Sequence, residues 1–113
     1  MADYAWLEHY IQKDVELKGG HFLFFDEKTQ DTLVLNFHGV HPYRVHKTGP
    51  NNFVACVDMR SRDGREFDLD FFIHRDENGQ TLTRIAIHQA EGHPRYAWYK
   101  DQGISKQRPV CQM

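Results

Sequence analysis

The segment ACVDMRSRDGREFDLDFFIH, residues 55–74, alternates large apolar and polar side chains on both sides of a turn that contains glycine. Such period-two alternation predicts two strands that bury one face. Asp58, Asp68 and Asp70 fall at the predicted strand centres, although aspartate is a poor strand former. The presence of these carboxylates on the polar face therefore indicates a structural or functional role.

The alternation also predicts how these strands pair. The apolar residues of the two strands lie opposite one another only if the loop between them has three residues, 62–64. Such a loop is typical of a type I turn followed by a left-handed glycine. Asp58 then lies opposite Asp68. The same reasoning predicts a three-residue loop at 77–79, which places His88 opposite Asp68 on the next strand.

The sequence thus predicts a transverse row of Asp58, Asp68 and His88, with Asp70 and Arg84 diagonal to it, as a candidate ligand-binding site. Carboxylates directly opposite each other repel, so a shared proton, a cation or protonated His88 is expected between them. The alternative is an exposed row whose carboxylates repel only weakly in water and are neutralised by Arg84 or Arg60.

The remaining chain reads as one helix followed by strands. Residues 3–18 form the predicted helix, with Asp3 as its N-cap and Gly19–Gly20 as its stop. Its apolar stripe consists of Tyr4, Leu7, Ile11 and Val15, widened by Trp6, Tyr10 and Leu17. Strands are predicted at about 21–26, 31–38, 42–47, 52–60, 65–74, 80–89 and 94–100.

Segments 31–38 and 42–47 are alternatively one long bent strand, and residues 102–113 are expected to be a loose tail. All connections are short, as antiparallel neighbours require. We therefore predict a single α+β domain, residues 1–113, in which the N-terminal helix packs on a curved antiparallel meander of six to seven strands.

Composition narrows the function classes. The net charge is −2 with histidine neutral, and Lys and Arg are dispersed, which argues against a nucleic-acid partner. No apolar run is long enough for a membrane span. The start Met-Ala-Asp fits a cytoplasmic protein and equally a bacterial periplasmic one whose export signal has been trimmed.

Histidine is abundant, with eight residues in 113. His38, His41 and His46 form a weak candidate metal site, and their alternative role is that of half-exposed strand residues. No glycine-rich nucleotide motif occurs, so the sequence predicts no cofactor unless these residues bind a divalent metal.

The two cysteines, Cys56 and Cys111, are expected to be free thiols. Cys56 is predicted on the polar face beside Asp70. The flanking aspartates should raise its pKa, so we reject it as a nucleophile.

The segments NFVACVDMRSRDGREFDLDFFI, residues 52–73, and IHQAEGHPRYAWYK, residues 87–100, resemble a small family of uncharacterised bacterial proteins. The resemblance covers about residues 31–100 and implies kinship without an activity; some such proteins look exported. The helix-then-meander layout is also similar to cystatin-like and NTF2-like folds, although the inhibitory Gln-x-Val-x-Gly loop of cystatins is absent.

Two function classes follow. The first is a small binding domain for an unknown small ligand, metal or protein, with the Asp/His row as its polar centre. The second is a small NTF2-like enzyme in which Asp68 acts as general base and His88 as its partner inside a cavity. Tyr43, Tyr96, Trp98 and Tyr99 either line a ligand cleft or cap the core. Exposed sheet edges also allow a homodimer.

Overall fold

The structure is a computed structural model of the chain, and it describes residues 4–109. The side chains of Tyr4 and of residues 42–44 are not described. The predicted N-cap Asp3, the side chains of Tyr4 and Tyr43, and Cys111 therefore lie outside the described residues.

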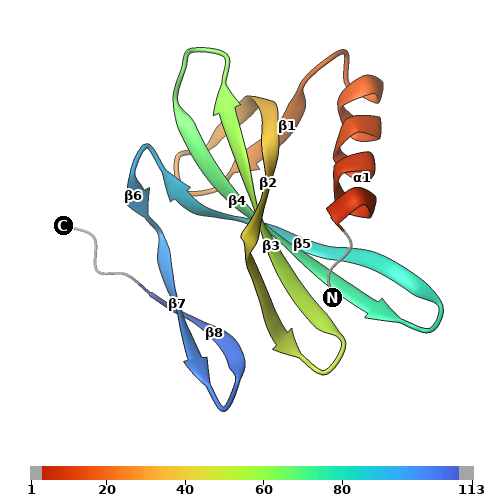
Figure 1. The fold of residues 1–113 in the computed structure, drawn as a ribbon. Coiled ribbons are helices and arrows are strands. Elements are labelled where there is room, and N and C mark those ends of the chain that lie inside the picture. Colours follow the sequence, from red (N-terminus) through yellow and green to blue (C-terminus); the bar gives the residue numbers. More distant parts are fainter. Residues whose placement is uncertain (1–3, 110–113) are drawn as a thin grey trace.

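The chain begins with one helix and continues as strands (Figure 1). Helix α1 spans Tyr4–Leu17. It ends where predicted, because Gly19 and Gly20 both have positive φ angles and the Gly20 amide donates to the Val15 carbonyl at 2.8 Å. The strands are β1 (Phe22–Asp26), β2 (Asp31–Gly49), β3 (Asn52–Ser61), β4 (Glu66–Asp76), β5 (Gly79–Ala90), β6 (His93–Pro94), β7 (Tyr96–Asp101) and β8 (Ile104–Pro109).

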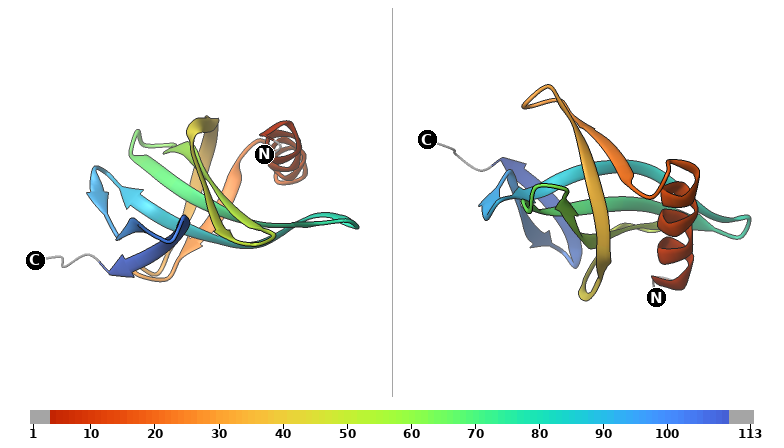
Figure 2. Two further views of the ribbon diagram at one scale, coloured as in Figure 1. Left: turned by 60° about the horizontal axis from the view of Figure 1, so that its bottom comes forward. Right: turned by 90° about the horizontal axis from the view of Figure 1, so that it is seen from above.

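Strands β1 to β6 form one antiparallel meander sheet in chain order, and β7 and β8 form a separate hairpin. The sheet curls strongly, so that the β1–β2 hairpin crosses above β4 and β5 (Figure 2). A helix packed on a curved antiparallel sheet confirms the predicted α+β class.

The main core lies on the helix-facing side of the sheet. Leu7 and Ile11 of α1 are fully buried, and the odd-numbered apolar residues of β3 and β4 join them. The core cluster comprises Leu7, Ile11, Phe22, Leu33, Leu35, Ala55, Val57, Met59, Phe67, Leu69, Phe71, Ile73 and Ile87. The alternation in the sequence therefore assigns this face correctly.

The observed strands match the alternative of one long bent strand at 31–49 and differ from the predicted ones near the C-terminus. The predicted strand 94–100 is divided into β6, which pairs with β5, and β7, which pairs with β8. Residues 31–49 form one continuous bent strand, whose register against β3 shifts between Phe37 and Gly39 and again between Val40 and Val45. The predicted loose tail 102–113 is wrong for Ile104–Pro109, which pair with β7 across a two-residue turn at Gln102–Gly103. Both turn residues have positive φ angles, as a type I′ hairpin turn requires.

A buried ion pair joins the two ends of the curled sheet. Arg95, which follows β6, donates to both carboxylate oxygens of Asp26 at the end of β1, at 2.6 and 2.9 Å. Both side chains are largely buried, and the Arg95 amide also donates to the carbonyl of His88 in β5. The pair therefore fixes the curl of the sheet and the point at which the β7–β8 hairpin leaves it.

Within the described residues, no helix is long and apolar enough to cross a membrane.

Candidate functional site

The central hairpin has the predicted register. Arg60 pairs with Glu66, and Asp58 lies directly opposite Asp68. The turn between them is closed by the Gly64 amide, which donates to the Ser61 carbonyl at 3.0 Å, and Gly64 has a φ of 91°. The carboxylates of Asp58 and Asp68 therefore do share the polar face of the sheet, as the alternation predicts.

The prediction that His88 is the third member of the row is wrong. Asp68 lies opposite Gln89, not His88, because the pairing of β4 with β5 slips by one residue between Asp68 and Leu69. The following hairpin also has a two-residue loop, since Asp76 pairs with Gly79. The β-bulge leaves His88 as the extra residue of β5 and turns it toward Asp70.

Asp70 is the buried carboxylate of this face, with a residue exposure of 1%. The Tyr96 hydroxyl donates to its Oδ2 atom at 2.5 Å, and the Trp98 indole N–H donates to the same atom at 2.9 Å. A carboxylate at a strand centre is thus tolerated because two donors from β7 satisfy it. Asp70 thereby ties the separate β7–β8 hairpin to the main sheet.

The β7–β8 hairpin covers the polar face with aromatic rings. Tyr96 stacks on the imidazole of His88 at 5.0 Å between ring centres, and Trp98 stacks on His46 at 5.3 Å. Burial, followed by the charge of Asp70, raises the pKa of Tyr96 well above its ordinary value, so its hydroxyl remains a donor. Tyr96 and Trp98 are therefore part of the site, whereas Tyr99 is 42% exposed.

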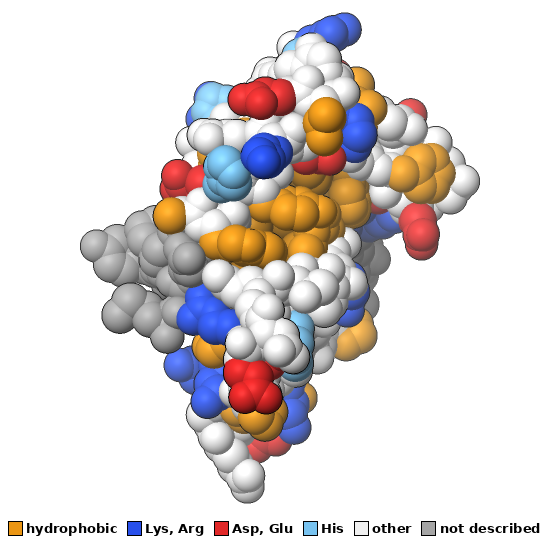
Figure 3. Space-filling model, turned by 90° about the vertical axis from the view of Figure 1, so that its right-hand side faces the viewer, with side chains coloured by type: hydrophobic (Ala, Val, Ile, Leu, Met, Phe, Trp, Pro, Cys, Tyr) orange, Lys and Arg blue, Asp and Glu red, His pale blue; other side chains and the backbone are white. Residues whose placement is uncertain are grey.

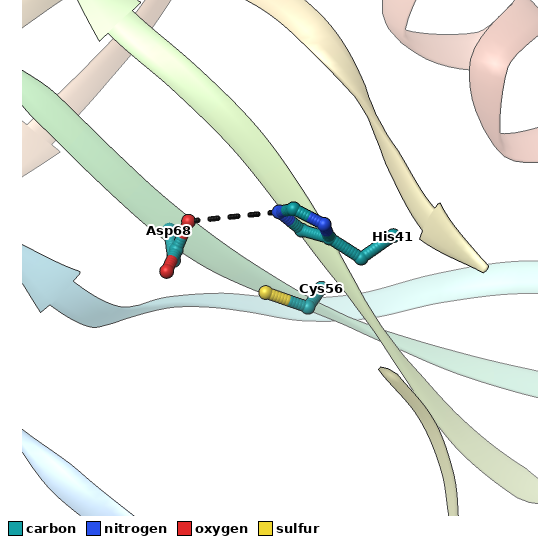
Figure 4. A group of neighbouring side chains, drawn as sticks. All are labelled: His41, Cys56 and Asp68. Carbon is teal, nitrogen blue, oxygen red and sulfur yellow. Dashed lines mark ion pairs between the residues drawn. The ribbon is translucent and has the colours of Figure 1, made fainter. Parts of the chain in front are cut away.

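Three potential metal ligands from three neighbouring strands meet at the edge of this covered face (Figure 4). They are His41 of β2, Cys56 of β3 and Asp68 of β4, and their donor atoms all lie within 4.8 Å of one another. The His41 Nε2 atom is 3.8 Å from Asp68 Oδ1. Because Cys56 is buried and the His41 side chain is 39% exposed, the group has a protein side and a solvent side.

Strand β2 brings His41 to this position through its irregularity. Val40 pairs with Val57 and Val45 pairs with Ala55, so β2 has more residues than β3 between these two pairs. His41 lies in that excess, next to core-facing Val40, and its side chain reaches the polar face beside Cys56. Sequence spacing alone cannot reveal this contact, because the bulged segment breaks the parity of the strand.

The predicted histidine cluster does not assemble. Of His38, His41 and His46, only His41 belongs to a potential ligand group among the described residues. His38 is exposed, and the ring of His46 packs on Trp98 with its Nδ1 atom 3.4 Å from the Ser105 hydroxyl. The prediction is therefore wrong about the neighbours of His41, which are Cys56 and Asp68 and not His38 and His46.

Arg84 also takes a role other than the predicted one. It lies opposite Phe72, as the register predicts, and its guanidinium stacks 4.6 Å above the Phe72 ring. It is exposed beside a surface hollow between β3, β4 and β5. Its contact with an aromatic ring replaces the expected neutralisation of the aspartate row.

A second ligand group shares Cys56 with the first. Cys56 lies directly opposite Asp70, and the donor atoms of Cys56, Asp70 and His88 also lie within 4.8 Å of one another. The His88 Nδ1 atom is 3.6 Å from Asp70 Oδ2 and is buried without a hydrogen-bond partner among the described residues. Such an unsatisfied buried nitrogen is rare and calls for an explanation.

A small cavity lies beside Asp58 and Asp68 in the described part of the chain. Asp58 and Asp68 line it together with Glu66 and Gln89, and its volume is about 80 Å³. Pockets for small organic ligands usually measure about 300–1,000 Å³, whereas a cavity of this size suits an ion and its water.

Comparisons with protein-family models, curated proteins and solved structures give no significant match for this chain.

Proposed function

We propose that this protein is a small binding domain for a divalent transition-metal ion, with Cys56, His41 and Asp68 as ligands. The observation that carries the proposal is the convergence of a thiol, an imidazole and a carboxylate from three adjacent strands within 4.8 Å. Thiolate, imidazole and carboxylate together are the ligand types that zinc accepts.

The distances support this assignment. Bonds of about 2.0–2.3 Å in a tetrahedral zinc site place neighbouring ligand atoms about 3.5 Å apart. The 3.8 Å separation of His41 Nε2 and Asp68 Oδ1 is close to that value. Small side-chain rotations would therefore complete three ligands and leave a fourth position facing solvent beside His41.

A cation also resolves the electrostatics of the site. Asp58 and Asp68 face each other, and Cys56 lies opposite Asp70 on the neighbouring strand. These carboxylates disfavour a thiolate on their own, whereas a bound metal deprotonates a coordinating thiol and offsets the repulsion between the acids.

The group of Cys56, Asp70 and His88 is less suitable as the primary site. Asp70 Oδ2 already accepts hydrogen bonds from Tyr96 and Trp98, and a metal there would have to displace these donors. We therefore assign this group a supporting role, in which Asp70 anchors the hairpin over Cys56.

The enzymatic alternative has weaker support. The predicted base Asp68 does not lie opposite its predicted partner His88, and the described cavity at Asp68 has a volume of only about 80 Å³. Proton transfer to an organic substrate requires both groups within hydrogen-bond reach of it. The geometry thus favours an ion over a substrate.

Cobalt titration tests the proposal, because Co²⁺ occupies zinc sites and a thiolate ligand gives it a charge-transfer absorption band. We expect the wild-type protein to show this band with one Co²⁺ per chain, and zinc to remove it. The Cys56→Ser variant should lose the band while keeping its circular dichroism spectrum. A wild-type protein that is folded, reduced and spectroscopically silent with Co²⁺ would overturn the proposed site.

A further inference from the structure

Helix α1 has a second apolar face that the sheet does not cover. Leu7 and Ile11 point into the core, whereas Tyr10 is 41% exposed and Leu17 is 86% exposed. Trp6 stacks on Tyr10 with 5.7 Å between ring centres. The sequence-based expectation that these residues widen the core stripe is therefore wrong for Tyr10 and Leu17.

These side chains line a groove along the outside of the helix. Its volume is about 360 Å³, and it is lined by Trp6, His9, Tyr10, Lys13, Asp14 and Leu17. Figure 3 shows the side of the molecule on which α1 lies, where hydrophobic side chains gather in a patch bordered by basic, acidic and histidine side chains. An apolar patch with a polar rim is typical of an interaction surface.

We propose that this groove binds α1 of a second copy of the chain, with the two helices antiparallel about a two-fold axis. The argument is the self-complementarity of the groove, because its six residues form three pairs that are symmetric about the middle of the stripe. A two-fold axis there places Trp6 against Leu17 of the second copy. It also places His9 against Asp14 and Tyr10 against Lys13.

Each of these pairs is chemically favourable. Trp6 and Leu17 bury apolar surface, and Tyr10 offers its ring to the Lys13 ammonium. His9 meets the carboxylate of Asp14, which within one chain is bound by Lys18 at 3.1 Å. A parallel arrangement would instead bring like residues together, including Lys13 against Lys13 and Asp14 against Asp14.

The contact is a single pair of short helices, so we infer a weak dimer. Stable interfaces usually bury about 1,200–2,000 Å² in total, which is more than two helices of 14 residues provide. Association should therefore depend on protein concentration in the micromolar range and above.

Sedimentation velocity at protein concentrations from about 5 to 500 μM tests this surface, since weak interfaces assemble only in the upper part of such a range. The wild type should shift from monomer toward dimer. Leu17→Glu should weaken dimerisation by more than about tenfold, because it places a carboxylate against Trp6. The control Gln12→Glu makes the same change of charge on an exposed position of α1 outside the groove and should dimerise like the wild type.

A charge exchange tests the two-fold pairing itself. His9→Asp places a new carboxylate against Asp14 of the second copy and should weaken dimerisation about fivefold. Adding Asp14→Lys restores opposite charges across the axis and should recover most of the loss. A monomer at every concentration, a dimer that persists in Leu17→Glu, or an exchange that fails to recover would each overturn the proposal.

Discussion

At the scale of single residues, Asp70 explains why this sheet carries carboxylates at its strand centres. Its Oδ2 atom accepts hydrogen bonds from the side chains of Tyr96 and Trp98, so a poor strand former is retained as an anchor for the hairpin. Asp58 and Asp68 are different, because they line a small cavity and face each other. One polar face therefore holds a structural carboxylate beside a pair that suits a cation.

The Tyr96 hydroxyl should contribute measurably to stability. Tyr96→Phe removes a hydrogen bond to a buried carboxylate, and we expect it to lower the free energy of unfolding by about 2 kcal/mol. Urea denaturation measures this difference. Tyr99→Phe changes an exposed ring on the same strand and should stay within about 0.5 kcal/mol of the wild type. Equal effects of the two variants would contradict the anchoring role of Asp70.

The Asp68→Asn variant distinguishes the repulsion between Asp68 and Asp58 from the proposed binding of a metal ion by Asp68. Without metal, the variant should be as stable as the wild type or slightly more stable, because the repulsion between Asp68 and Asp58 is relieved. With zinc, it should lose most of the increase in melting temperature that the wild type shows. Thermal denaturation with and without zinc checks both parts, and an unchanged zinc response would remove Asp68 from the site.

At the scale of elements, regular alternation was sufficient to predict the β3–β4 hairpin and insufficient where a strand bulges. Met59 faces Phe67 and Asp58 faces Asp68, as the pattern requires. The bulge at His88 has no glycine or proline beside it. Around His41, Gly39 and Pro42 mark an interruption of the strand, but they do not tell how many residues β2 inserts there. A slip of one residue therefore separated His88 from Asp68, and an excess of three residues in β2 hid the approach of His41 to Cys56.

The β7–β8 hairpin was only half predictable. Its first strand carries aromatic residues, but ISKQRP in β8 has no apolar alternation and is held by backbone pairing with β7. Only Gly103 in the sequence pointed to the turn of this hairpin, because two-residue type I′ turns favour glycine at their second position.

The Asp26–Arg95 pair joins β1 to the start of this hairpin and should make stability depend on pH. Hydrogen bonding to Arg95 lowers the pKa of Asp26 below its ordinary value, outweighing burial. The pair's contribution is therefore present above the unfolded pKa of about 4 and is lost as the pH falls through the lowered folded pKa.

Replacing Asp26 tests this pair. Asp26→Asn should lower the free energy of unfolding by about 3 kcal/mol at pH 7, since it leaves Arg95 buried without its counter-charge. The difference from the wild type should shrink as the pH falls below about 4. Asp101→Asn, which breaks the exposed pair with Lys106, should have little effect. A difference that does not change with pH would contradict the ionic nature of the Asp26–Arg95 contact.

At the scale of the whole molecule, the curled sheet separates two interiors. Its helix-facing side forms the apolar core, and its other side is closed by the β7–β8 hairpin over Asp70, His88 and Cys56. The candidate metal site lies where this cover ends, so one of its ligands is buried and another reaches solvent. The architecture therefore brings ligands from three strands together while leaving one side open to an ion.

The most direct test of the account is the zinc-dependent melting temperature of the wild type, of His41→Gln and of the matched control His38→Gln. Zinc at about 100 times its dissociation constant should stabilise the native state by about 2.7 kcal/mol, which raises the melting temperature by about 10 °C for a domain of this size. We predict that His38→Gln keeps this increase and that His41→Gln loses most of it. No increase in the wild type, or an equal increase in both variants, would contradict a metal site built on Cys56, His41 and Asp68.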